Sequence, residues 1–193
     1  VLAAFTLNEL TPFVFSLQPG QRHALYHGPL KNQSEHKLAD LFEAERELPL
    51  APLTAMPDEI SVINVFSLGS AEAVERVSAS IADEPHLVAY SGIAIHEREM
   101  GEHATEEPAL HWIDIHHSLG SKGNGINHLR KELEIDHVIA FGDGDNDLSM
   151  FECASECYAP ANADPIILNA ADEIIGHHDE DGVARFLRKR FEL

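Results

Sequence analysis

Residues 142–147 concentrate the groups of this chain that are best suited to chemistry. They read Gly-Asp-Gly-Asp-Asn-Asp, which places three carboxylates and a carboxamide within six residues. Carboxylates this close repel one another, and a hard cation such as Mg²⁺ relieves the repulsion because it prefers oxygen ligands. The residue types and their spacing therefore predict a bound Mg²⁺ ion.

The elements on either side support a site at this position. The apolar run from Val138 to Phe141 predicts a short buried strand, and an apolar helical pattern begins at Leu148. Gly142 and Gly144 permit a tight turn between the two elements. Open α/β sheets bind their ligands at the carboxyl ends of strands, which is where these carboxylates fall.

Two other interpretations of residues 142–147 compete with a Mg²⁺ site. A calcium loop of the EF-hand type is excluded, because position 6 of that pattern is Leu148 rather than Gly and position 12 is Ala154 rather than Glu. A solvated turn rich in Asp and Gly is the remaining alternative. The strand before it and the helix after it favour a site.

Composition restricts the class of partner. The chain has 193 residues and a net charge of −20, which argues against nucleic-acid backbones and anionic membrane surfaces. It contains no run of 18 apolar residues, so no transmembrane helix is predicted. Cys153 and Cys157 are the only cysteines, and two reduced packing thiols are typical of a cytoplasmic protein.

The pattern of elements changes after Gly120. Before it we predict an α+β domain with a largely antiparallel sheet, formed by strands at 12–17, 22–27, 60–68, 87–95 and 110–116 and helices at 35–47 and 70–81. A hairpin turn at 18–21, a Pro-rich connection at 49–57 and a polar loop at 97–107 complete this part. After Gly120 strands and helices alternate, which predicts parallel crossovers. The predicted fold class is α/β: an α+β domain in residues 1–118 and part of a Rossmann-like core with a parallel sheet in residues 119–193.

Lys122 lies at the predicted start of a helix over residues 123–133. A lysine is unfavourable there because the positive end of the helix dipole lies at the N-terminus, which favours anions. Its presence suggests another role, such as bridging a phosphate and a carboxylate. A solvated surface lysine is the alternative.

Four segments, taken in order, resemble the haloacid dehalogenase superfamily. They are specific in spacing and point to the Cof-type branch of Mg²⁺-dependent sugar-phosphate phosphatases. The segments are Ser121-Lys-Gly123, Gly142 to Met150, Ala161-Asn-Ala163 and Asp179 to Ala184. The resemblance covers about residues 110–193, whereas residues 1–118 resemble the α/β cap of that branch at the level of pattern.

The resemblance implies a phosphoaspartyl mechanism for small phosphorylated metabolites, with sugar phosphates as the expected class. One Asp attacks phosphorus and a second handles protons, while Mg²⁺ neutralises the developing charge. By position, Asp143 would be a direct metal ligand and Asp147 a second carboxylate that holds the metal or its water. Lys122 would pair with the phosphoryl group and the nucleophile. Asn146 would fix the loop or the phosphate, and Asn162 would lie near the phosphate pocket.

The nucleophile of that family has no counterpart at its usual place. The family carries it in an Asp-x-Asp-Gly-Thr/Val loop after the first core strand, before the cap, and this sequence begins inside or at the edge of the cap. We therefore expect the chain to be inactive by itself. Three alternatives stay open: an upstream segment with the core strand was lost, another chain or segment supplies it, or the chain is a degenerate relative. The alternative is an inactive module that binds phosphate or metal or has a regulatory role.

Other candidates have weaker support. Asp179-Glu-Asp181 has the letters of the nucleophile loop but follows the predicted strand 173–175 only after three further residues. His177 and His178 are expected in a solvated loop, and the histidines around Trp112 at polar ends of a cap strand. P-type ion pumps share the acidic loop, residues 142–147, but a pump requires transmembrane helices, and none is predicted here. Nothing in the sequence distinguishes a phosphomutase of the same superfamily from a phosphatase.

Overall fold

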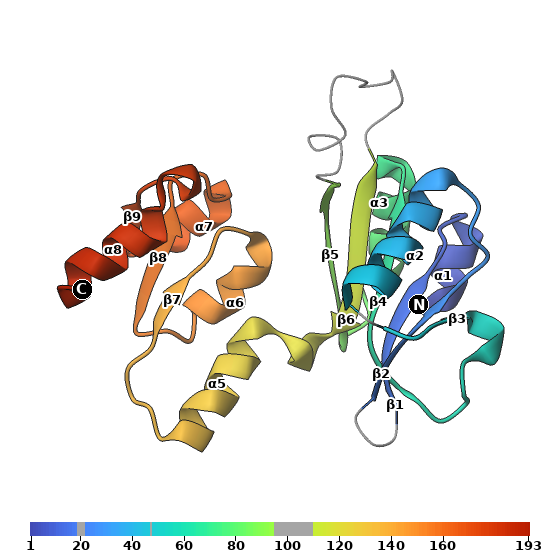
Figure 1. Ribbon diagram of the computed structural model, residues 1–193, viewed down its shortest axis with the longest axis horizontal. Helices are drawn as coiled ribbons and strands as arrows, with labels where there is room; N and C mark the ends of the chain where they lie inside the picture. The colour runs from blue at the N-terminus through green and yellow to red at the C-terminus, as the bar shows by residue number, and fades with distance from the viewer. Residues whose placement is uncertain (19–21, 47, 95–109) are drawn as a thin grey trace. The chain divides into compact units, whose positions relative to one another are not determined.

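The computed structural model describes residues 1–18, 22–46, 48–94 and 110–193 (Figure 1). The chain divides into two compact units, Val1–Ser118 and Leu119–Leu193. The boundary between them in the sequence falls close to Gly120, where the pattern of elements changes. The loop predicted at 97–107 and the centre of the turn predicted at 18–21 lie outside the described residues.

The first unit is built on a six-stranded sheet with the order β3-β2-β1-β4-β6-β5. Neighbouring strands are antiparallel except for β2 and β3, which are parallel. The strands are β1 (Phe13–Gln18), β2 (Arg22–His27), β3 (Leu50–Pro52), β4 (Ser61–Gly69), β5 (Leu87–Ile93) and β6 (His111–His117). The α+β arrangement predicted from the strand-like runs is therefore present.

Helices cover this sheet from both faces. They are α1 (Leu2–Leu7), α2 (Gln33–Arg46) and α3 (Ala71–Ile81), with a 3₁₀ turn η1 (Leu53–Ala55) after β3. The stripe Val74, Val77 and Ile81 of α3 packs with Ile113 and Ile115 of β6, and all five side chains are buried. Burial of each such side chain contributes roughly 1.5–3 kcal/mol, so this stripe fixes α3 on the sheet.

The second unit has a parallel sheet of three strands in the order β7-β8-β9. Its strands are β7 (Ile139–Phe141), β8 (Glu156–Pro160) and β9 (Glu173–Ile175), and its helices are α5 (Lys122–Leu133), α6 (Leu148–Phe151), α7 (Pro165–Ala170) and α8 (Gly182–Phe191). Short 3₁₀ turns are η2 (Ser118–Gly120), η3 (Asp145–Asp147) and η4 (His178–Glu180). The predicted α/β fold with a partial parallel sheet is confirmed.

Both faces of this small sheet carry apolar groups, as expected for parallel strands. Ala140 and Ala159 lie in a buried cluster with Ile167 of α7. The rings of Tyr158 and Phe186 lie 4.2 Å apart between centroids. The strands therefore have the short apolar sequences of a covered sheet instead of an alternating pattern.

The apolar helical pattern that begins at Leu148 forms only a short helix in the structure. Residues 145–147 form the turn η3, and α6 extends only over Leu148–Phe151. The chain then returns to the sheet, because the N–H of Ser155 donates to the carbonyl of Val138 at 2.8 Å. No helix among the described residues has both the length and the apolar character needed to cross a bilayer.

Candidate metal and phosphate site

The loops that follow the three parallel strands lie at one edge of the sheet, because parallel strands end on the same side. Two hydrogen bonds join these loops. The N–H of Asp164, after β8, donates to the carbonyl of Asp143, after β7, at 2.8 Å. The N–H of His178, after β9, donates to Oδ1 of Asn162 at 3.1 Å. The acidic loop and Asn162 therefore belong to one connected edge.

Asp147 is the fixed centre of this edge. Asp147 is only 3% exposed, although its side chain is a carboxylate. Oδ2 accepts hydrogen bonds from the backbone N–H groups of Asp143 at 2.9 Å and Gly144 at 3.3 Å. Oδ1 accepts from Nζ of Lys122 at 2.5 Å. A buried carboxylate is retained only when such partners satisfy it, so this loop is built around its charge.

Gly142 is required by the position of Asp147. A Cβ atom placed on Gly142 would lie 2.6 Å from the Cβ of Asp147, far inside van der Waals contact. Any larger residue would displace either the end of β7 or the carboxylate. The glycine that the sequence suggested for a tight turn therefore serves chiefly as a close-packing residue.

Asp143 presents its carboxylate differently. Its backbone is held on both sides, by the bond from its N–H to Asp147 and by the bond from Asp164 to its carbonyl. The residue is exposed, so the carboxylate can take an ion from solvent. An exposed carboxylate beside a buried, fixed one is a set of oxygen donors that suits Mg²⁺, which binds through one or two carboxylates and retains several waters.

Lys122 reaches this loop because the start of α5 is anchored on α6. Ser121 caps the helix by accepting from the N–H of Asn124 at 3.2 Å. The N–H of Gly123 donates to Oγ of Ser149 at 3.2 Å. A Cβ atom on Gly123 would lie only 2.1 Å from the carbonyl oxygen of Ser149, so only glycine permits this approach.

The ammonium group of Lys122 is thereby brought to a residue 25 positions later in the chain. Half of the Lys122 side chain is exposed, whereas the Asp147 side chain is 5% exposed. An ammonium group has three donors, so Lys122 can bind an anion while it keeps its bond to Asp147. Asp147 thus holds the cationic ammonium group of Lys122 beside the position expected for the metal.

The two asparagines predicted at the site lie on the same edge. Asn146 is half-buried in η3, and its Oδ1 would be 3.1 Å from a Cβ placed on Gly144. Asn162 binds the backbone of His178 and so holds the loop after β9. The structure gives Asn162 a structural partner that the sequence did not indicate, and its role toward phosphate stays a prediction.

His177, His178 and Asp179 were not predicted to act together. Their ligand atoms, one from each residue, all lie within 4.8 Å of one another. No periodic pattern signals this, because the three residues are consecutive and enter the turn η4. The neighbouring Asp181 has a left-handed backbone, with φ 55°, and occupies the N-cap position of α8 without a capping hydrogen bond from its side chain.

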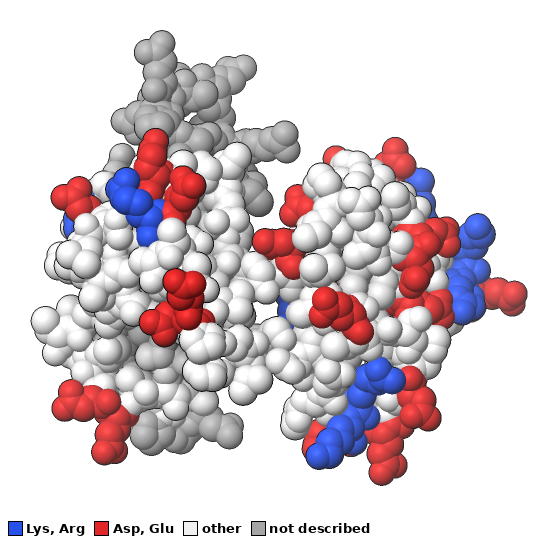
Figure 2. Space-filling model, turned by 180° about the vertical axis from the view of Figure 1, so that it is seen from behind, with Lys and Arg blue, Asp and Glu red and all other residues white. Residues whose placement is uncertain are grey.

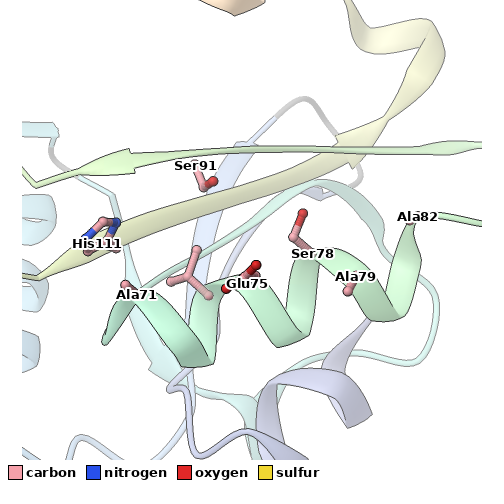
Figure 3. A pocket seen from close by; sticks show the side chains of 8 residues that line it. Ala71, Glu75, Ser78, Ala79, Ala82, Ser91 and His111 are labelled. Atoms are coloured by element: carbon pink, nitrogen blue, oxygen red, sulfur yellow. The ribbon is translucent and has the colours of Figure 1, made fainter.

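The first unit has a groove of its own (Figure 3). It measures about 420 Å³ and lies between α3 and the strands β5 and β6. Its polar lining includes Glu75 and Ser78 from α3, Ser91 from β5 and His111 from β6. The carboxylates of the acidic loop belong to the other unit.

Comparisons with known proteins agree with the motifs. A family model described as haloacid dehalogenase-like hydrolase matches residues 13–187. The putative phosphatase YxeH of Bacillus subtilis is 28% identical over 163 residues, which cover 83% of this chain and 55% of that protein. This chain thus spans about half the length of that relative.

Solved structures share the fold. A haloacid dehalogenase-like hydrolase from B. subtilis superposes with a TM-score of 0.69 at 21% identity, covering 97% of this chain and 67% of that one. A subclass IIB sugar phosphatase of the superfamily gives a TM-score of 0.66 at 20% identity, covering 100% of this chain and 65% of that one. At these identities the likeness concerns the fold alone.

Proposed function

Because the chain belongs to the haloacid dehalogenase-like hydrolases of the Cof type, we propose that it forms the metal- and phosphate-binding part of a Mg²⁺-dependent phosphohydrolase. The proposed substrates are small phosphorylated metabolites, with sugar phosphates as the leading class. Similarity to a putative phosphatase supports the hydrolase activity, and the resemblance of the four motif segments to the Cof-type branch supports the substrate class. We propose the first unit as the cap, and the second as part of the catalytic core.

One observation carries the proposal. The buried carboxylate of Asp147 binds Lys122 through one oxygen and two backbone N–H groups through the other. A purely structural ion pair would not require an exposed carboxylate, that of Asp143, in the same loop. A fixed cation beside carboxylate oxygens is the arrangement that phosphoryl transfer needs, because the reaction depends on positioning and on charge stabilisation.

In the proposed reaction, residues of this chain would bind the metal, bind the phosphoryl group and position the loops around it. Asp143 and Asp147 would hold Mg²⁺, which supplies charge neutralisation at the phosphoryl oxygens. Lys122 would donate to a phosphoryl oxygen, and Asp147 would keep its ammonium group in place. Asn146 and Asn162 would shape the loops around the phosphate. Each of these groups binds or orients, and none of them needs to form a covalent bond.

The covalent step needs a further carboxylate. In the proposed reaction an Asp oxygen attacks phosphorus, and the bond from phosphorus to the leaving oxygen breaks as a second Asp gives that oxygen a proton. Water then hydrolyses the aspartyl phosphate, releasing phosphate and restoring the first carboxylate. Asp143 and Asp147 are assigned to the metal, and Asp179 lies in a turn beyond the end of β9.

We therefore propose that the nucleophile belongs to a segment outside residues 1–193. In the part of the chain that the structure describes, β7 lies at an edge of its sheet, with β8 as its neighbour. A strand with an open edge offers unpaired N–H and C=O groups to another strand. A segment that paired there would end beside the acidic loop.

Charge favours a small substrate over a macromolecule with a phosphate backbone. The net charge of −20 opposes binding of nucleic acids or anionic membranes. Acidic side chains are spread over both units on the face shown in Figure 2, while basic ones gather in a few places. The free thiols of Cys153 and Cys157 suit the cytoplasm, where we place the protein.

Hydrolysis of p-nitrophenyl phosphate tests this proposal. The chain is assayed with and without Mg²⁺, first alone and then with an added segment that carries the Asp-x-Asp-Gly-Thr/Val strand and loop of a family member. We expect Mg²⁺-dependent activity only in the complemented sample. Activity of the chain alone would show that the nucleophile lies within it, with Asp179 as the first candidate.

Failure of complementation is informative once folding is established by circular dichroism. A folded chain that binds the added segment and stays inactive would favour the module without catalytic activity. The control is a segment in which the first Asp of the loop is replaced by Asn, which should bind equally and restore nothing.

A further inference from the structure

The turn after β9 gathers three metal-ligating side chains outside the acidic loop. Nδ1 of His177 lies 3.6 Å from Oδ2 of Asp179, and Nδ1 of His178 lies 3.3 Å from Oδ1 of the same residue. The two imidazole rings are stacked, with centroids 4.6 Å apart. Two nitrogen donors therefore lie beside the same carboxylate.

These separations are compatible with ligands of one shared ion. A hydrogen bond from nitrogen to oxygen is usually about 2.7–3.2 Å long, so 3.6 Å is too wide for one and 3.3 Å lies at the outer limit. Zinc binds nitrogen at about 2.0–2.1 Å and carboxylate oxygen at about 2.0–2.2 Å, which places the ligands of a tetrahedral ion about 3.4 Å apart. The observed 3.3 and 3.6 Å are close to that value, and they end on the two different oxygens of the Asp179 carboxylate.

The backbone of the turn is fixed before any ion binds. The N–H of Gly182 donates to the carbonyl of His177 at 3.1 Å, and the N–H of Glu180 donates to it at 3.0 Å. Asn162 holds the N–H of His178. A Cβ on Gly182 would lie 1.8 Å from the carbonyl oxygen of Gly176, so this packing also admits only glycine. Little backbone freedom would be lost on binding, which favours affinity.

Binding of an ion would replace one existing hydrogen bond of His177. Nδ1 of His177 accepts a hydrogen bond from the N–H of Asp179 at 3.2 Å, and the same lone pair would bind the ion. The three side chains are half-buried or exposed, so the backbone group left without this bond can turn to water. The cost of the exchange is therefore small.

We propose that His177, His178 and Asp179 form a binding site for a divalent transition ion of the zinc type. Two imidazoles and one carboxylate leave one position of a tetrahedral ion for water or another ligand. The nitrogen donors distinguish this site from the oxygen-lined acidic loop, which suits Mg²⁺. The site is independent of the proposed hydrolase activity.

Calorimetric titration of the whole chain with Zn²⁺ tests the proposal. We expect one binding event per chain that is tighter than the rest and is retained in excess Mg²⁺. Asp179→Asn keeps the size of the side chain, and His178→Ala removes one donor. Each variant should weaken the tight event by about tenfold or more, because loss of even a supporting group at a metal site has an effect of that order.

Two control variants make the result specific. The double variant His116→Ala/His117→Ala removes another adjacent histidine pair, and Asp143→Asn alters the proposed Mg²⁺ site. Both should keep the tight event. Its loss in a control, or its persistence in Asp179→Asn and His178→Ala, would overturn the proposal. With Co²⁺ as the probe, an absorption band of cobalt bound to sulfur would place the ion on a cysteine and would also overturn it.

Discussion

Lys122→Met should lower the Mg²⁺-dependent hydrolysis rate of the complemented enzyme by about 10²–10³-fold, the effect of removing one preorganised donor to the transition state. Methionine keeps much of the length of the side chain but removes the ammonium group. Asp147 would lose the partner that binds its Oδ1 at 2.5 Å, and the phosphoryl group would lose a fixed cation. The measurement is kcat with p-nitrophenyl phosphate, together with binding of inorganic phosphate to the chain alone.

The matched control is Lys131→Met in the last turn of the same helix. Lys131 is exposed and lies at the C-terminal end of α5, so its loss removes the same charge away from the acidic loop. We expect its rate and phosphate affinity to stay near those of the parent chain. Equal effects of the two substitutions would show that Lys122 acts only through net charge.

Gly123→Ala should destabilise the second unit by about 1–3 kcal/mol, the usual cost of forcing extra atoms into a packed contact. The new Cβ would lie 2.1 Å from the carbonyl oxygen of Ser149, which is backbone and has little room to move. The start of α5 would then shift away from α6 and carry Lys122 with it. Urea unfolding measures the stability, and phosphate binding measures the displacement.

Gly125→Ala is the control in the same helix, two residues later. A Cβ at this position meets nothing within 4 Å. Alanine is a better helix former than glycine, so this variant should be more stable by about 0.5–1 kcal/mol. The two Gly→Ala changes are therefore expected to have opposite signs. Destabilisation by both, or by neither, would contradict the packing that positions Lys122.

The elements with a clear period were predictable from the sequence. The helix predicted at 70–81 is present as α3, and its N-cap Ser70 accepts from the N–H of Ala73 at 3.2 Å. The alternation after Gly120 predicted the parallel strands, because strand and helix patterns differ in period. These features depend on local sequence, which a single chain reveals.

Features that depend on tertiary contacts were not predictable. The strand β3 falls within the Pro-rich connection at 49–57 and has only three residues, too few for a pattern. It forms because it pairs with β2, where the N–H of Leu25 also donates to the carbonyl of Pro49 at 3.0 Å. The early end of α6 likewise reflects the return of the chain to the sheet.

In the candidate site, too, the sequence predicted the residue types but not the tertiary contacts. The sequence indicated the residue types of the acidic loop and singled out Lys122, but it did not predict the hydrogen bond from Lys122 to Asp147 or the two backbone bonds to that carboxylate. Those contacts depend on Gly123 and Gly142, whose importance lies in the space they leave. The roles assigned to Asp143, Asp147, Asn146 and Asn162 stay predictions.

A Mg²⁺ titration of the chain by calorimetry tests the central claim, that the acidic loop is a metal site. We expect saturable binding of one ion, weakened by about tenfold or more in Asp143→Asn, because this substitution removes a ligand charge. The control Asp145→Asn removes the same charge from an exposed residue of the same loop and should bind Mg²⁺ like the parent chain. Unchanged affinity in Asp143→Asn, or equal losses in both variants, would contradict the assignment.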